Sequence, residues 1–181
     1  KIKHDGEVEE TVRKYLSGNS DNKGVALSER TDRRGKNNYT VKDITFSGNE
    51  KNDYTIFCGS DIEITVKVVS KNPFDTNIQC AIAIFDHNGN ILTDLSNYFT
   101  NDSLIPGKEK SFEIKCKLQE FNLNAGTYRY NCWLSTDIEL EDYVLNAGTF
   151  VINEGDFFST GKSLPLNKGS VLVKQEWNIS S

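Results

Sequence analysis

Residues 78–97, IQCAIAIFDHNGNILTDLSN, decide the fold, because they predict two strands joined by a tight turn. In 78–86 every second residue is an apolar residue, as in a strand with one buried face. Asn88-Gly89 follows, and this dipeptide is the strongest short signal for a β-hairpin. Residues 91–97 are then the return strand. On the buried face we expect Ile78, Cys80, Ile82 and Ile84.

The same two-residue period continues on both sides of this hairpin and predicts an all-β fold. Turn signals recur every 8–12 residues or so, a spacing typical of an antiparallel β-sandwich with about eight or nine strands. No long helix is expected between Gly24 and the end of the chain. The further strands are expected at residues 24–29, 39–48, 61–70, 111–118, 126–135, 144–152 and 171–179.

The N-terminal part of the chain has a different pattern. Residues 7–17, EVEETVRKYLS, place apolar side chains at helical spacing, and Gly18 ends the run, so we expect a short amphipathic helix. The chain contains no Met, so we expect a fragment or a processed product. Our expected organisation is a junction helix and linker in 1–22, followed by one β-sandwich domain in 23–181.

Composition excludes several classes of protein. The chain has 181 residues, of which 36% are hydrophobic and 26% are charged, which suits a folded domain rather than a disordered or membrane-embedded chain. No apolar stretch approaches the roughly 20 residues of a transmembrane helix. The net charge of -5 argues against nucleic acid or anionic lipid as the main partner.

The sequence offers no constellation for catalysis or cofactor binding. The two histidines, His4 and His87, are isolated, and no His/Cys cluster has the spacing of a metal site. Residues 86–90, DHNGN, are favoured as a plain turn over a calcium loop. We therefore expect no enzyme activity, no catalytic residue, no metal and no cofactor. Free thiols are favoured over disulfides, because three of the four cysteines fall on apolar strand faces. The cysteines are Cys58, Cys80, Cys116 and Cys132.

One polar strand face carries an unexpected aromatic residue. Trp133 lies on the side of 126–135 that is otherwise polar, where an indole gains little from water. We expect this strand to pair with 78–86, whose small outward residues would leave a shallow trough beside the ring. A flat ring surrounded by amides and a guanidinium suits a sugar, because the ring covers C–H groups while the amides bind hydroxyls. The candidate carbohydrate-binding residues are Trp133, Asn131, Arg129, Gln79, Asn146 and Tyr98.

Ordinary structural explanations for these residues stay open. Trp133 would also suit a covered core position, beneath the loop 154–170 or the N-terminal helix, or a dimer interface. Arg129 and Asn131 would also suit a plain solvated face, and packing is favoured for Trp177.

Four segments together resemble a known family. They are VKDITFSG (41–48), AIFDHNGNIL (83–92), LNAGTYRYNCWLS (123–135) and DYVLNAGTFVI (142–152). In their order and spacing they resemble the C-terminal carbohydrate-binding domain of the ATP-binding subunit, of the Wzt type, of bacterial ABC exporters for O-polysaccharide.

The resemblance implies a fold, a ligand and partners. It implies an immunoglobulin-like sandwich that recognises lipid-linked O-polysaccharide, often at its non-reducing end, without catalysis. It implies a homodimer with exchange of the C-terminal strand, an ATPase domain upstream of the junction, a transporter membrane subunit as partner, and a cytoplasmic location peripheral to the inner membrane. Two alternatives remain: a secreted or cell-surface sugar-binding module of an adhesin or glycoside hydrolase, and a purely structural dimerisation domain.

Overall fold

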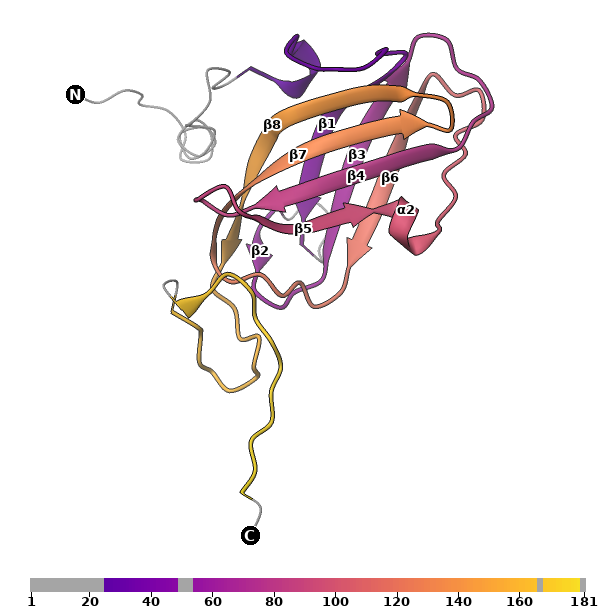
Figure 1. Cartoon of the computed structure of the whole chain (residues 1–181). Helices are drawn as coiled ribbons and strands as arrows, with labels where there is room; N and C mark the ends of the chain where they lie inside the picture. The colour runs from indigo at the N-terminus through magenta and orange to yellow at the C-terminus, as the bar shows by residue number, and fades with distance from the viewer. Residues whose placement is uncertain (1–24, 49–53, 166–167, 180–181) are drawn as a thin grey trace, which may run out of the picture. The chain divides into compact units, whose positions relative to one another are not determined.

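The computed structural model describes residues 25–48, 54–165 and 168–179 of the chain. This part is nearly all β, with eight strands and two short helical turns, and it confirms the predicted all-β class (Figure 1). The strands are β1 (Tyr39–Ser47), β2 (Ile56–Phe57), β3 (Ile62–Ser70), β4 (Ile78–Phe85), β5 (Ile91–Ser96), β6 (Ser111–Leu118), β7 (Gly126–Thr136) and β8 (Leu140–Asn153). The helical turns are η1 (Leu27–Glu29) and α2 (Asn97–Thr100).

The strands form two sheets of a sandwich. The first sheet has the order β1-β3-β6, and the second has the order β2-β8-β7-β4-β5. In the second sheet β4 pairs antiparallel with both β5 and β7, which confirms the predicted hairpin and the predicted pairing of 78–86 with 126–135. The two-residue β2 is an exception to the antiparallel pattern, because it runs parallel to β8.

The described residues divide into two compact units. Unit 1 comprises residues 25–45, 65–115 and 127–150, and unit 2 comprises residues 46–48, 54–64, 116–126, 151–165 and 168–179.

Unit 1 contains most of both sheets, which lie face to face with an apolar core between them (Figure 1). The alternation predicted for 78–86 is confirmed, since β4 shows strict alternation of buried and half-buried residues. Burying each Ile or Val side chain here stabilises the fold by about 1.5–3 kcal/mol. The core side chains of β3, β4 and β7 in this unit are Val66, Val68, Ile78, Cys80, Ile82, Ile84, Tyr128, Tyr130, Cys132 and Leu134.

Unit 2 is held together by short backbone pairings. The amide of Cys58 donates to the carbonyl of Asn153 at 3.0 Å, and the amide of Gly59 donates to Phe121 at 2.9 Å. The C-terminal segment contributes a single β-bridge between Leu123 and Val171.

Two of the predicted strands are wrong. Residues 24–29 were expected to be extended, but 27–29 form the 3-10 turn η1, closed by a 2.8 Å bond from the Glu29 amide to the Ala26 carbonyl. Val25 is 44% exposed, so the apolar alternation of this stretch has no sheet to cover it. Residues 171–179 have strand-like alternation but form only the one bridge, because no further backbone partner is available within the described part of the chain. The predicted helix 7–17 and the junction 1–22 lie outside the described residues.

Candidate functional site

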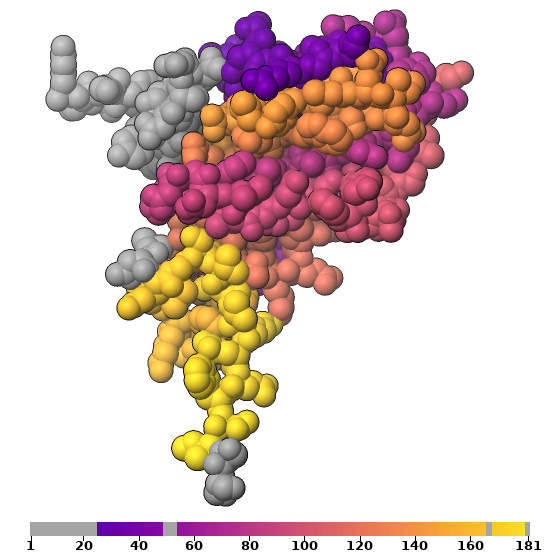
Figure 2. All heavy atoms as spheres, in the orientation of Figure 1, coloured from indigo at the N-terminus to yellow at the C-terminus, as the bar shows by residue number. Residues whose placement is uncertain are grey.

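A groove with a volume of about 510 Å³ lies on the outer face of the second sheet, entirely within unit 1. This volume is in the range of about 300–1,000 Å³ that small-molecule sites occupy. Figure 2 shows the face that bears the groove, with β7 and β8 in orange and β4 and β5 in magenta. The groove is lined by Gln79, Ala81, Ala83, Phe85, Ile91, Asp94, Ser96, Tyr98, Phe99, Asn131, Trp133 and Tyr143.

Strand register arranges most of these residues in rows across β7, β4 and β5. Trp133 in β7 is opposite Ala81 in β4, and Ala81 is opposite Ser96 in β5. Two residues further along, Ala83 is opposite both Asn131 and Asp94. Because neighbouring strands lie about 4.8 Å apart and side chains alternate between faces, each row presents its three side chains on the same outer surface.

The two alanines of β4 are the floor of the groove. Each has a larger residue on either side, so the central strand is the lowest of the three. The half-buried Trp133 stands over this floor from the β7 side. The trough beside an indole that the sequence predicts is therefore present.

Asn131 is held in one orientation by β8. Its Oδ1 atom accepts a 2.8 Å hydrogen bond from the amide of Asn146, whose φ of 47° places it in the left-handed region. This bond uses the oxygen of the Asn131 side chain and leaves its NH₂ group as the donor that a ligand could meet.

The helical turn α2 forms one rim of the groove. Ser96 caps it by accepting a 3.2 Å bond from the Tyr98 amide. The Asn97 side chain braces it against β4, since it accepts from the amide of Cys80 at 2.8 Å and donates to the carbonyl of Ile78 at 3.0 Å. Tyr98 and Phe99 are 63% and 71% exposed, with ring centroids 5.5 Å apart. A braced turn thus holds two aromatic rings in solvent.

The β4–β5 hairpin lies beyond the opposite end. Asp86 accepts bonds from the amides of Asn88 at 2.9 Å and Asn90 at 2.8 Å, and from the Asn90 side chain at 2.9 Å. The hydrogen bonds from Asn90 lower the pKa of Asp86 below its usual value. Residues 86–90 are therefore a self-satisfied turn, as the sequence favours.

The structure brings together four of the six predicted site residues. Trp133, Asn131, Gln79 and Tyr98 line the groove. Asn146 does not line it and acts on it only through Asn131.

Arg129 also lies outside the groove lining. It is opposite Phe85 in the β4–β7 register, and its Nη2 atom would be 3.2 Å from a Cβ placed on Gly89, so its guanidinium lies beside the hairpin turn.

Six lining residues were not predicted. Tyr143 belongs to the first residues of β8, which starts at Leu140 rather than at 144 as predicted. Ile91 in β5 is opposite Phe85 because of a register shift between Ile84 and Phe85 that alternation alone does not reveal. The strand pairing itself was a usable signal, because it places Asp94 and Ser96 opposite the two alanines. The missed residues are Phe85, Ile91, Asp94, Ser96, Phe99 and Tyr143.

Buried charges fix the β8 side of the sheet. Asp142 accepts from Nη1 of Arg33 at 2.7 Å and from the amide of Val41 at 2.8 Å, while Glu141 accepts from the amides of Asn38 and Tyr39. Burial raises the pKa of Asp142, although the Val41 amide and Arg33 oppose this effect. The segment before β1 is thereby attached to the strand that supplies Tyr143.

The groove has the chemistry of binding rather than of reaction. Its lining contains no cysteine or histidine, and the described residues contain no group of three or more His, Cys, Asp or Glu that could hold a metal ion. None of the four cysteines, all of which lie among the described residues, forms a disulfide. No helix in the described part of the chain is long and apolar enough to cross a membrane.

Two comparisons with known proteins point to the same family. The family model described as the Wzt C-terminal domain matches residues 30–163. Among solved structures, the crystal structure of the C-terminal domain of Wzt matches with a TM-score of 0.66 and 14% identity, over 83% of this chain and 90% of that chain. At this identity the structural match shows a shared fold.

Other structural matches are weak and carry no functional argument. A Bacteroides uniformis β-glucuronidase has a TM-score of 0.40 and 11% identity, over 56% of this chain and 12% of that chain. The Pseudomonas fluorescens alkylpurine DNA glycosylase AlkC, bound to DNA, has a TM-score of 0.41 and 11% identity, over 66% and 31%. Comparison with curated protein sequences finds no match.

Proposed function

This chain belongs to the Wzt C-terminal domain family, and from that premise we propose that it binds a lipid-linked O-polysaccharide in the groove over β4, β5 and β7. The family supports a general carbohydrate-binding role, without catalysis, in O-antigen export by ABC transporters. The finer proposal is that the bound part is the non-reducing end of the glycan, and that the residues binding it are those of the groove.

The observation that carries this proposal is the row of Trp133, Ala81 and Ser96. An indole beside a low alanine floor offers a flat apolar surface with space above its neighbour, which suits the C–H face of a pyranose ring. Asn131 and Gln79 supply amides and Tyr98 supplies a rim ring. A small number of polar groups such as these is enough to fix the orientation of a ligand whose main contact is apolar.

The size of the groove favours a terminal residue over a long stretch of polymer. Its floor is two alanines of one strand, which span about 7 Å, close to the length of one sugar ring. Phe85 and Ile91 line it toward the hairpin, while Tyr98 and Phe99 line it toward α2. A groove bounded by large side chains at both ends suits the end of a chain.

The proposed partners follow from the family and from the C-terminal segment. We place this domain downstream of an ATPase domain, on the cytoplasmic side of the inner membrane, in contact with the transporter through that ATPase. Free buried cysteines agree with a reducing compartment. A homodimer with exchanged C-terminal strands is supported by alternate apolar residues that the described part of the chain leaves exposed. They are Val171, Val173, Trp177 and Ile179, from 45% to 100% exposed.

The test is a titration of the chain with the O-polysaccharide of its own source cell. Because the chain has only two tryptophans, Trp177→Phe leaves Trp133 as the sole indole, and its fluorescence reports on the groove. We expect a saturable change, and a loss of affinity of tenfold or more, about 1.4 kcal/mol, on Trp133→Ala measured by calorimetry.

The matched control is Trp177→Ala, which removes the other indole and should leave affinity per chain unchanged. Saturable binding that survives Trp133→Ala would move the site away from the groove. An absence of saturable binding would contradict the proposed function itself.

A further inference from the structure

The groove lining contains a single formal charge, the carboxylate of Asp94 in β5. The other polar side chains that line it are uncharged, and no lysine, arginine or histidine is among the lining residues. Two arginines are opposite lining residues but do not line the groove themselves: Arg129, opposite Phe85, has its guanidinium beside the hairpin turn at Gly89, and Arg34 is opposite Tyr143. An anionic group over the alanine floor would therefore meet a carboxylate and no positive charge among the lining residues.

We propose that the groove selects an uncharged sugar residue, a neutral hexose, a 6-deoxyhexose or an N-acetylhexosamine, and that Asp94 is the residue that rejects uronates and phosphorylated sugars. This inference rests on the proposed function, because it concerns the ligand of the same groove. It goes further by naming the ligand class and the residue that determines it.

The row of Asn131, Ala83 and Asp94 supplies the geometry. Asn131 and Asp94 are both opposite Ala83, on the two strands that flank β4, so their backbones are about 10 Å apart with only a methyl group between them. The Asn131 oxygen is already bonded to the Asn146 amide at 2.8 Å. In this row Asn131 can therefore donate hydrogen bonds to a ligand through its NH₂ group, and Asp94 can accept them through its carboxylate.

A hydroxyl-bearing ligand satisfies both sides of this row. Each sugar hydroxyl is a donor and an acceptor, so neighbouring hydroxyls accept from Asn131 and donate to Asp94. An ionised carboxylate or phosphate accepts from Asn131 but has no proton to donate to Asp94. It would instead place two like charges across the floor of the groove.

The rest of the lining adds to this preference. Trp133, Phe85 and Ile91 offer apolar surface, and taking a charge out of water against apolar surface without a partner is costly. A methyl group in place of a hydroxymethyl group, as in a 6-deoxyhexose, costs nothing against the same surface and gains from it. The groove thus favours sugars with an apolar edge.

The first test presents the whole chain to an array of purified bacterial O-polysaccharides of known structure. One half is neutral, the other half carries uronate or phosphate, and the source cell's own polysaccharide is included. We expect binding to neutral polymers only, with a signal that high salt does not weaken, because no ion pair forms. Preferential binding to acidic polymers would overturn this inference and leave the proposed function standing. Binding to no polymer would overturn both.

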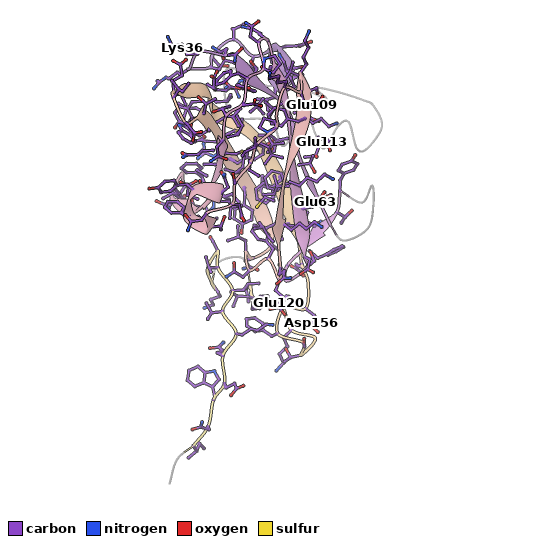
Figure 3. All side chains as sticks on the ribbon, turned by 90° about the vertical axis from the view of Figure 1, so that its right-hand side faces the viewer. Lys36, Glu63, Glu109, Glu113, Glu120 and Asp156 are labelled. Atoms are coloured by element: carbon purple, nitrogen blue, oxygen red, sulfur yellow. The ribbon has the colours of Figure 1, made fainter. Side chains whose placement is uncertain are left out.

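The second test assigns the selectivity to Asp94. Asp94→Asn keeps an acceptor oxygen and removes the charge, so we expect the ratio of the affinity for uronate-containing polymers to that for neutral polymers to rise about tenfold. Glu113→Gln is the matched control, because it removes the same charge from the outer face of the other sheet, where Figure 3 labels this residue. An unchanged ratio in Asp94→Asn, or an equal change in Glu113→Gln, would overturn the assignment.

Discussion

The two outer faces of unit 1 belong to one sandwich and are built in opposite ways. The outer face of the β1-β3-β6 sheet is charged: Lys67, Glu113 and Lys115 are exposed there, and the Lys67 Nζ atom is 3.9 Å from Asp43 Oδ2. Figure 3 labels Glu113 on this face. The groove on the outer face of the other sheet is lined by alanines beside Trp133 and by one carboxylate. A charged face needs only water to be stable, and solvation of one face is usual for antiparallel sheets.

The groove face is different because the strands of this sheet carry few charged side chains and bury two of them. Glu141 and Asp142 of β8 are buried, and backbone amides of the segment before and within β1 donate to both. The outer surface is left with aromatic and small side chains, a combination that marks interaction sites on soluble proteins. We infer that the fold depends on the buried charges and the core, and that the groove face is reserved for a ligand.

Filling the groove should have the largest effect on the proposed difference in function between the two faces. Ala83→Trp places a second indole on the floor, opposite both Asn131 and Asp94. We expect glycan affinity to fall more than about 100-fold, or about 2.7 kcal/mol, because the ligand and the new ring need the same space. The free energy of unfolding should change by no more than about 0.5 kcal/mol, since the site is on the surface. Calorimetry and urea unfolding measure the two quantities.

Val69→Trp is the matched control for the charged face. Val69 is 37% exposed on β3, so the same indole is added to the outer surface of the other sheet. Affinity should be unchanged there. Equal losses of affinity in both variants would mean that the two faces do not differ in function.

The sequence predicts this face better than it predicts the ends of the molecule. A period of two fixes which side of each strand is buried, and the Asn88-Gly89 turn fixes the hairpin, so the neighbours of Trp133 follow from pattern alone. The sequence predicts the correct face for Arg129, but this residue does not line the groove, and its guanidinium lies beside the hairpin turn at Gly89. Spacing along a strand cannot show where a long side chain ends.

Segments without a sheet partner are where pattern fails. Residues 171–179 alternate as a strand does, yet within the described part of the chain only Val171 pairs, with Leu123. Alternation indicates that one face of a segment is apolar and suited to burial, but it does not indicate which segment packs against that face. The rim turn α2 was missed for a related reason, since its four residues are too few for helical periodicity and depend on the Asn97 side chain.

The next prediction asks whether the groove works independently of the dimer. Trp177→Ala combined with Ile179→Ala removes the two most exposed apolar side chains of the C-terminal segment. If a second copy buries them, each contributes about 1.5–3 kcal/mol, and sedimentation equilibrium should show dimerisation weakened at least tenfold. Glycan affinity per chain should not change. Unaltered dimerisation would contradict strand exchange, and lost glycan binding would tie the groove to the dimer.

The smallest expected effect is on the pH dependence of stability, and it concerns the buried carboxyl group of Asp142. Burial is the main cause that raises the pKa of Asp142 above its usual 3.8, and its Oδ1 atom is buried without a hydrogen-bond partner among the described residues. The native state therefore binds this proton more tightly than the unfolded chain does. The contribution of Asp142 to stability is then most favourable below pH 3.8 and declines as pH rises through the pKa of the folded state.

The variant Asp142→Asn removes that titration. The free energy of unfolding of the unaltered chain minus that of the variant should fall as the pH rises from below 3.8 through the pKa of the folded state. Urea unfolding across this range measures the difference. A difference that grows with pH would show that the 2.7 Å contact with Arg33 keeps the carboxylate ionised. In that case the ion pair between Arg33 and Asp142 would stabilise the fold, and burying the ionised carboxylate would not lower the free energy of unfolding.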